Sequence, residues 1–255
     1  MQKRKIIAVS GKGGAGKTSV SALIIKNLMA ADSGKILAID ADPATGLATA
    51  LGMEPGKTVN DIRKDVVKAV KRGKMQASDD TASLLDYELF GALVQNKNLA
   101  LLAIGRPEEE GCFCKVNSLL KDIIQDLAAR FDMVVIDGEA GVEQINRRVM
   151  SNVDSLILVS DTSAKAVNVI KTIAHLVKDQ NACRCKDIGL VLNKVRSEAE
   201  VENIRNGLPV PIYGYLPEDD NIRAYDFAGR SFLEMPDDDP ANRAVQGILK
   251  TANIL

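Results

Sequence analysis

The stretch from Gly11 to Thr18, which reads GKGGAGKT, constrains the fold more than any other part of this 255-residue chain. It matches the pattern G-x-x-x-x-G-K-[ST] and stands between an apolar run at Lys5–Ser10 and a helical pattern at Thr18–Ala30. Glycines in this pattern let backbone N–H groups close around phosphate oxygens at the positive N-terminus of the following helix. A tight glycine turn with a chance lysine is the alternative, and the strand-to-helix context counts against it. We therefore expect a phosphate-binding loop here.

Individual residues of this loop have distinct expected roles. Lys17 is suited to neutralise the β- and γ-phosphates, and the Thr18 hydroxyl is suited to ligate Mg²⁺. We therefore expect ATP or ADP with Mg²⁺ as the ligands of the loop. The predicted nucleotide-binding residues of this segment are Gly11, Gly13, Gly14, Ala15, Gly16, Lys17, Thr18 and Ser19.

Short apolar runs alternate with helical patterns along the rest of the chain. Most of these runs are continuously apolar, as expected for strands that are covered on both faces. Repeated strand–helix units predict an α/β fold, with a doubly wound, mostly parallel sheet and helices on both faces, in a single domain over residues 1–255. Element boundaries are least clear in the stretch Gly52–Asn98, which contains a basic amphipathic helical pattern with Arg63, Lys64, Lys68, Lys71, Arg72 and Lys74. The other expected strands are Lys35–Asp40, Leu99–Ile104, Met133–Asp137, Leu156–Ser160, Ile188–Asn193 and Pro211–Tyr215, and the other helical patterns are Val116–Arg130, Ala164–Lys178, Glu198–Asn206 and Asn242–Asn253.

Composition excludes several classes of protein. Lys and Arg total 33 against 34 Asp and Glu, whereas a general nucleic-acid binder needs a large basic excess. No apolar run approaches the roughly 20 residues that span a bilayer, and the apolar stretch after Lys5 ends at Gly11, too early for an export signal. We expect a cytoplasmic protein without nucleic-acid or membrane partners, whose four cysteines are reduced thiols.

Acidic residues follow two of the expected strands. Asp40 and Asp42 stand at the end of Lys35–Asp40, and Asp137 ends Met133–Asp137. In an open α/β sheet, ligands bind beyond the carboxyl ends of the strands, so these carboxylates should converge near the phosphate loop. Mg²⁺ and an attacking water must be held there. We predict Thr18, Asp40 and Asp137 as Mg²⁺-binding residues.

Lys12, directly after the first glycine, resembles the deviant Walker A motif of the MinD/ParA/nitrogenase-iron-protein ATPases. The resemblance covers nearly the whole chain and implies a P-loop NTPase of the SIMIBI type that hydrolyses ATP. It further implies a homodimer that encloses two ATP molecules, with Lys12 reaching the partner's phosphates. In this family pattern Asp42 orients the attacking water and Asp137 supports Mg²⁺ through water. Lys12, Lys17 and Asp42 are thus the expected catalytic residues.

Two later segments look like the adenine-recognition segments of the same family. Asn193-Lys194 follows an expected strand, and Leu216-Pro217-Glu218 follows Tyr215. An Asn side chain can both accept from and donate to an adenine edge, which makes Asn193 chemically suitable. A loop-capping role for Asn193 is the alternative.

Two cysteine pairs of the form C-x-C occur in different kinds of connection. Cys112 and Cys114 lie between an expected strand and helix, at the nucleotide edge, whereas Cys183 and Cys185 lie between a helix and a strand, at the opposite edge. A closed tetrahedral metal site needs four ligands, and two-fold symmetry would provide them from one Cys112/Cys114 pair in each subunit. Semi-buried structural thiols are the alternative.

The segment Gly105–Cys114, together with Asp137–Glu143, resembles the CooC/AcsF branch, the nickel-inserting ATPases that mature carbon monoxide dehydrogenase and acetyl-CoA synthase. In that branch the C-x-C pair binds metal between subunits. Ligand chemistry alone does not select nickel, because four thiolates suit Zn²⁺ at least as well. The resemblance thus implies Ni²⁺ (or Zn²⁺) at a dimer interface and one of these two enzymes as the client. Cys183 and Cys185 are not part of the pattern, and we interpret this second pair as structural thiols.

Two rival functions remain open at this point. One is a ParA/MinD-type positioning ATPase, against which the acidic balance and the C-x-C pair count. The other is an electron-transfer ATPase like the nitrogenase iron protein, with an Fe–S cluster between subunits. That protein takes its two cysteines per subunit from two separate loops. We therefore expect an ATPase that delivers nickel.

Overall fold

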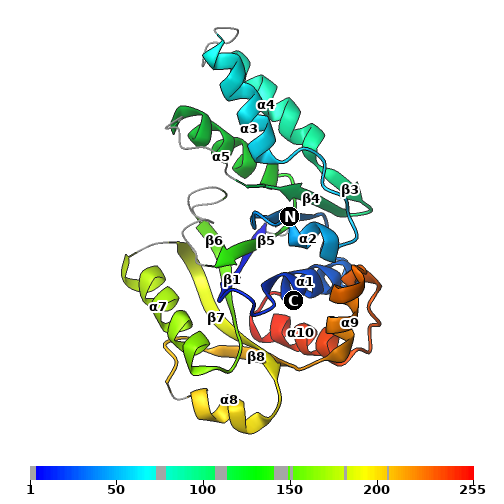
Figure 1. The fold of residues 1–255 in the computed structure, drawn as a ribbon, viewed down its shortest axis with the longest axis vertical. Helices are drawn as coiled ribbons and strands as arrows, with labels where there is room; N and C mark the ends of the chain where they lie inside the picture. Colours follow the sequence, from blue (N-terminus) through cyan, green and yellow to red (C-terminus); the bar gives the residue numbers. More distant parts are fainter. Residues whose placement is uncertain are drawn as a thin grey trace.

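The computed structural model describes residues 4–72, 79–106, 114–140, 149, 152–180, 183–205 and 207–255. Within these ranges the strands form one eight-stranded sheet in the order β3-β4-β2-β5-β1-β6-β7-β8 (Figure 1). All neighbouring strands are parallel except β3, which runs antiparallel to β4 at one edge. The strands are β1 Lys5–Gly11, β2 Ile36–Asp40, β3 Val94–Asn96, β4 Leu99–Ala103, β5 Met133–Ala140, β6 Asn152–Ser160, β7 Arg184–Val195 and β8 Ile212–Pro217.

Helices cover both faces of the sheet, which confirms the doubly wound α/β architecture expected from the sequence. One face packs against α3, α4, α5, α7 and α8, and the other packs against α1, α2, the short 3-10 helix η1 and α10. In Figure 1, α3, α4 and α5 stand together at one end of the molecule, beside β3 and β4. The helices are α1 Lys17–Ala30, α2 Gly46–Ala50, α3 Val59–Lys71, α4 Asp79–Ala92, α5 Cys114–Ala128, α7 Ala164–Gln180, α8 Glu198–Arg205, α9 Asp220–Ala228, η1 Phe232–Glu234 and α10 Pro240–Thr251.

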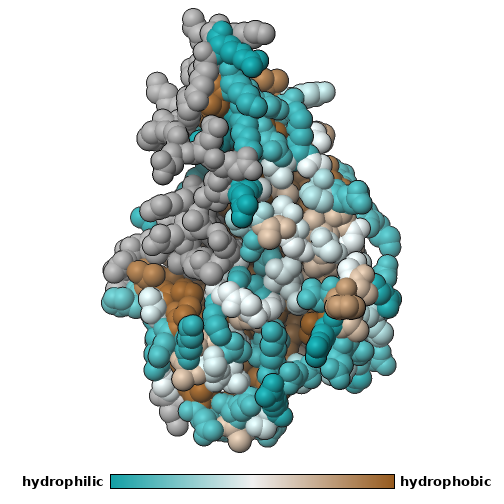
Figure 2. All heavy atoms as spheres, in the orientation of Figure 1, coloured by the Kyte–Doolittle hydropathy of each residue, from teal (hydrophilic) through white to brown (hydrophobic). Residues whose placement is uncertain are grey.

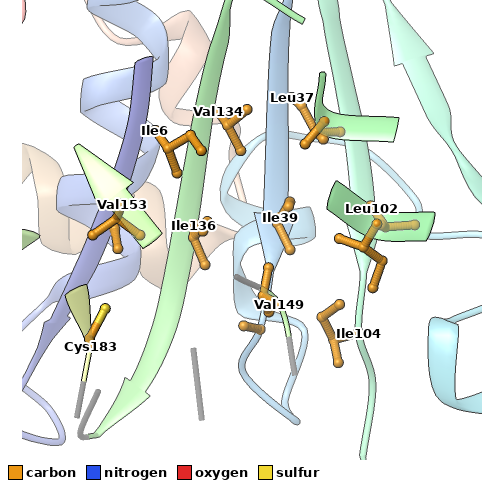
Figure 3. Packing of buried hydrophobic residues seen from close by; sticks show 14 of the residues in the cluster. Ile6, Leu37, Ile39, Leu102, Ile104, Val134, Ile136, Val149, Val153 and Cys183 are labelled. Atoms are coloured by element: carbon orange, nitrogen blue, oxygen red, sulfur yellow. The ribbon is translucent and has the colours of Figure 1, made fainter. Parts of the chain in front are cut away.

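The central strands are apolar throughout because both of their faces are buried. Successive residues of β1 point to opposite layers, so Ile6 and Ala8 belong to one core while Ile7 and Val9 belong to the other. All five residues of β2 and all five of β4 are buried. Figure 3 shows one of the two layers, in which Leu37 and Ile39 of β2 lie between Ile136 of β5 and Leu102 of β4.

The strands expected from the sequence are all present, with small differences at their ends. The expected strand Ile188–Asn193 extends to Arg184–Val195, because its first residues pair with the beginning of β6. The unclear stretch Gly52–Asn98 contains α3, α4 and the antiparallel β3. In the part of the chain that the structure describes, no helix is long and apolar enough to cross a membrane.

The last helix, α10, is part of the core. Asp239 begins it by accepting hydrogen bonds from the N–H groups of Ala241 and Asn242, at 2.9 and 3.4 Å. The side chains of Val245, Ile248 and Leu249 are buried against the sheet and α1. Its apolar face is therefore used inside the protein.

We predict that Leu249→Ala lowers the free energy of unfolding by about 2–5 kcal/mol, because it leaves a cavity in a fully buried layer. Lys250→Ala, one residue further on the exposed side of α10, should change it by less than about 0.5 kcal/mol. Urea unfolding of both variants measures the difference. Equal midpoints for the two variants would show that α10 does not cover the core.

Candidate functional site

The phosphate loop connects β1 to α1 and lies against the backbone and side chains of two other strands. Gly11 has a φ of 142°, and a Cβ on it would lie 2.1 Å from the carbonyl oxygen of Val159 in β6. Gly16 has a φ of 87°, and a Cβ there would lie 2.3 Å from the Nδ2 atom of Asn193 in β7. These two positions require glycine because the neighbouring strands leave no room for a side chain and the backbone is left-handed or nearly so.

The N-terminus of α1 is open to an anion. Its capping residue is Gly16, so no side chain accepts hydrogen bonds from the first N–H groups, and the first turn contains no acidic residue. Unpaired N–H groups and the helix dipole together favour a negatively charged ligand. The Lys17 side chain is only 8% exposed, and its ammonium group lies 3.3 Å from the carbonyl oxygen of Lys12 inside the loop. The loop therefore offers both backbone donors and a fixed positive charge.

Asp137 of β5 connects the sheet to the first turn of α1. The Thr18 hydroxyl donates to its Oδ2 atom at 2.7 Å, and the Ser21 hydroxyl donates to its Oδ1 atom at 2.8 Å. Asp137 is almost fully buried, and burial raises its pKa to about 6, although the two hydroxyl donors and the Lys17 charge lower it. The sequence predicted Asp137 and Thr18 as neighbours, but gave no reason to include Ser21.

Asp40 lies beside Asp137, because the two residues are paired in register on the adjacent strands β2 and β5. Its Oδ2 atom accepts hydrogen bonds from the N–H groups of Leu47 and Ala48, at 2.9 and 3.3 Å, in the first turns of α2. Burial, and next the charge of Asp137, raise the pKa of Asp40 to about 7. Two carboxyl groups therefore share a buried region in which ionisation of each group is unfavourable.

Asp42 follows β2 in the loop before α2. Its Oδ1 atom accepts a hydrogen bond from the N–H of Ala44 at 2.8 Å, which fixes the turn. Asp42 also lines a cavity of about 610 Å³ that includes Gly14, Lys17 and Thr18 of the phosphate loop. The structure thus brings together the loop and all three carboxylates that the sequence predicted at this edge.

Lys12 lies outside that cavity lining and makes an ion pair within its own chain. Its ammonium nitrogen is 2.8 Å from an oxygen of Asp161, the residue after β6. Partial burial opposes ionisation of Asp161, but hydrogen bonds from Lys12 and Ser163 and the Lys12 charge hold the pKa of this carboxyl below its usual range. Both side chains are about a quarter exposed, so we infer only a small net stabilisation from the pair. No sequence pattern singled out Asp161.

The cavity continues from the phosphate loop to α9. Beyond the loop its walls include Lys194, Pro217, Glu218 and Arg223. The Arg196 Nε atom lies 2.7 Å from Glu218, which pairs these two exposed side chains at the rim. Helix α9 was not expected from the sequence, although Asp219 begins it by accepting a hydrogen bond from the N–H of Asn221 at 2.7 Å. An Asp before a short amphipathic stretch is the signal that could have found it.

Asn193 and Leu216, both predicted to bind the nucleotide, are placed differently: Asn193 lines the cavity, whereas Leu216 does not. The Nδ2 group of Asn193 donates to the carbonyl oxygen of Ala15 at 2.8 Å, and its Oδ1 accepts from the N–H of Lys194, so this side chain supports the phosphate loop. These bonds are consistent with the loop-capping alternative, while contact of Asn193 with adenine stays a prediction. Leu216 points into the core and is fully buried, because alternate residues of β8 face opposite sides. Its side chain does not line the cavity.

The cysteines are only partly described. Cys112 lies outside the described residues, and Cys114 is the first residue of α5, with a side chain that is not described. Cys183 is buried in the core before β7, and burial, together with the nearby Cys185, raises the pKa of its thiol to about 11. This supports the structural reading of the second pair. The described residues contain no group of three or more His, Cys, Asp and Glu side chains arranged to hold a metal ion.

The sequence of the chain matches the family described as the CobQ/CobB/MinD/ParA nucleotide binding domain, over residues 6–232. An uncharacterised ATP-binding protein of Methanocaldococcus jannaschii is 40% identical over 245 residues, which are 95% of this chain and 96% of that protein. The carbon monoxide dehydrogenase accessory protein CooC of Rhodospirillum rubrum is 28% identical over 240 residues, which are 90% of this chain and 89% of that protein.

A solved structure has the same fold. The septum site-determining protein MinD from Pyrococcus horikoshii, complexed with Mg-ADP, superposes with a TM-score of 0.65 and 21% identity, over 96% of this chain and 94% of that one. The matched family covers the phosphate loop, the three carboxylates and β8. The chain therefore belongs to the CobQ/CobB/MinD/ParA nucleotide-binding domain family and is a P-loop ATPase of the MinD/ParA type.

Proposed function

We propose that the chain couples ATP hydrolysis to the delivery of nickel to carbon monoxide dehydrogenase or acetyl-CoA synthase, and that it acts as a homodimer. The observation that carries the hydrolytic part is the convergence of Lys17, Thr18, Asp42 and Asp137 at one edge of the sheet. The nickel part is supported by the likeness to CooC over most of both chains and by the C-x-C pair whose second cysteine begins α5.

The proposed roles follow from the geometry of the site. The N–H groups of the loop and the Lys17 ammonium group bind the phosphates. Asp42, held by its turn at the rim of the cavity, orients the attacking water. Lys12 leaves Asp161 and reaches the phosphates of the partner subunit. Because that ion pair is partly exposed, breaking it costs little.

The residues near the loop fit Mg²⁺. Thr18, Asp137 and Asp40 provide hydroxyl and carboxylate oxygens, which are the ligands that this hard cation prefers together with phosphate and water. A cation would also offset the burial and the repulsion from Asp137 that raise the pKa of Asp40. Bound Mg²⁺ neutralises charge that develops on the phosphate oxygens.

The placement of α5 supports a metal site near the nucleotide. Helix α5 begins at Cys114, after β4, and β4 is parallel to β2 with its end in register with Asp40. The chain therefore leaves β4 at the same edge as the carboxylates, and α5 is the next described element. One C-x-C pair from each subunit supplies four thiolates on a two-fold axis, and transferred nickel is the cargo of this site. The buried apolar face of α10 counts against the alternative of a membrane-bound positioning ATPase.

We predict that Asp42→Asn retains nucleotide binding but hydrolyses ATP at least about 100-fold more slowly, because it removes the group that orients water. Lys17→Ala should instead weaken nucleotide binding itself. Single-turnover hydrolysis and a fluorescent ADP titration, made on both variants, separate the two effects. Turnover by Asp42→Asn at the wild-type rate would overturn the role of Asp42.

The raised pKa values of Asp40 and Asp137 predict a pH dependence of the nucleotide-free protein. Both values lie above those of an unfolded chain, so the folded state holds extra protons between about pH 4 and pH 7. The contribution of these groups to stability is therefore largest at low pH and is lost as the pH rises through about 6 to 7. Asp40→Asn should gain stability relative to wild type over that range, as measured by urea unfolding at several pH values. A pH-independent difference would contradict the assignment.

For the metal site we predict one Ni²⁺ or Zn²⁺ ion per two chains, and metal-induced dimerisation by mass action. Cys112→Ser should abolish this dimerisation and leave nucleotide binding intact. Cys185→Ser is the matched control, because Cys185 is a half-buried thiol at the opposite edge and should change neither property. Metal titration followed by sedimentation measures both. Binding of one ion per monomer, or metal-induced dimerisation of Cys112→Ser, would contradict the interfacial metal site but not the ATPase function.

A further inference from the structure

Helix α4 carries apolar residues on two opposite faces. Leu85, Leu89 and Ala92 are buried in the core. On the other face Leu84, Tyr87 and Phe90, spaced three residues apart, are 37%, 75% and 55% exposed. Since the helix advances about 1.5 Å per residue, these three side chains form a stripe of about 9 Å along its surface. We call Leu84, Tyr87 and Phe90 the α4 stripe.

An apolar groove continues the stripe at the C-terminal end of α4. The groove has a volume of about 510 Å³, and Phe90 belongs to both the stripe and its wall. The other apolar residues of the lining are Leu93, Leu99, Ala100, Leu127 and Phe131. Figure 1 shows α4, β3 and the neighbouring helices at one end of the molecule, and Figure 2 shows brown, apolar atoms between hydrophilic ones at that end.

The described charged residues that line this groove are all basic, whereas Asp86 and Glu88, on either side of Tyr87 in α4, are each paired with a cation. The described lining of the groove includes Lys35, Lys97 and Arg130 but no Asp or Glu. Arg130 lies 4.0 Å from Asp86, whereas Lys35 and Lys97 make no side-chain ion pair with any described residue. An apolar surface flanked by unpaired cations is complementary to a ligand with apolar and acidic groups.

We propose that the α4 stripe and this groove dock an acidic amphipathic helix of a partner protein. Apolar residues of the partner at positions i, i+3 or i+4 and i+7 cover the stripe, and its carboxylates meet Lys35 and Lys97. The groove is lined by the first residues of β4, at the end of the sheet opposite to the nucleotide cavity. Partner docking and nucleotide binding therefore use different surfaces, and the inference does not depend on the nickel function.

A synthetic probe tests this proposal on the full-length protein with MgADP bound. The probe is a fluorescein-labelled, 16-residue helical peptide with leucines along one face and glutamates beside them. Its matched control has lysines in place of the glutamates. Fluorescence anisotropy should give a Kd of about 1–100 μM for the acidic peptide, weakening with added salt, and at least about tenfold weaker binding of the basic one. Equal binding of the two peptides would overturn the proposal.

Variants locate the binding surface. Tyr87→Ser should weaken binding of the acidic peptide about tenfold, because it removes the most exposed aromatic side chain of the stripe. Phe227→Ser is the control, since Phe227 is a 94% exposed aromatic side chain on α9. Equal effects of the two variants on peptide binding would contradict docking of a partner helix. So would a Tyr87→Ser variant whose affinity for the peptide is unchanged but which loses self-association in sedimentation.

The charges have their own test. Lys35→Gln combined with Lys97→Asn should weaken binding about tenfold and remove most of its salt dependence. Asn is chosen at position 97 because its φ of 55° is a left-handed conformation that Asn tolerates. Lys165→Gln combined with Lys250→Gln removes two exposed cations elsewhere and should leave the Kd unchanged. Unchanged binding by the first double variant would overturn the proposed role of the cations.

Discussion

Two buried carboxyl groups in adjacent strands, Asp40 and Asp137, determine how the rest of the site is arranged. Each is costly to ionise, and each offsets part of that cost with hydrogen bonds to a different element. Asp137 accepts from the first turn of α1, whereas Asp40 accepts from the first turns of α2. The two helices are thereby fixed to one end of the sheet, and with them the phosphate loop before α1 and the Asp42 turn before α2.

The phosphate loop is held from both sides by groups that need not touch a ligand. The β6 backbone passes so close to Gly11 that no side chain fits, and Asn193 of β7 donates to the loop backbone. Lys12, on the outside of the loop, pairs with Asp161 and adds little to this support. A loop preorganised in this way loses little conformational freedom when it binds phosphate, which favours affinity.

The sequence predicted those parts of the protein in which the residue types and the spacing of apolar residues indicate the same structural element. The apolar strands, the glycine loop and the acidic residues at the strand ends could all be recognised in the sequence. Their convergence could be predicted because a parallel topology places the ends of β1, β2 and β5 together. The role of Asn193 was less readable, since an Asn after a strand suits either a ligand or a loop. Asp161 and Ser21 could not be found, because their importance depends on contacts between distant segments. Helix α3 falls on the basic amphipathic stretch that the sequence indicated, whereas α4 was missed because apolar residues on two of its faces obscure the helical period.

The antiparallel strand β3 has a consequence for how variants of this protein would fail. It is only three residues long, and it covers the edge of β4, whose five residues are all buried and apolar. An uncovered apolar strand is a template for pairing with another chain. We therefore expect that a deletion of β3 causes aggregation through β4 before it unfolds the central sheet. A low yield of the deletion variant would then result from pairing between exposed β4 edges and not from a damaged nucleotide site.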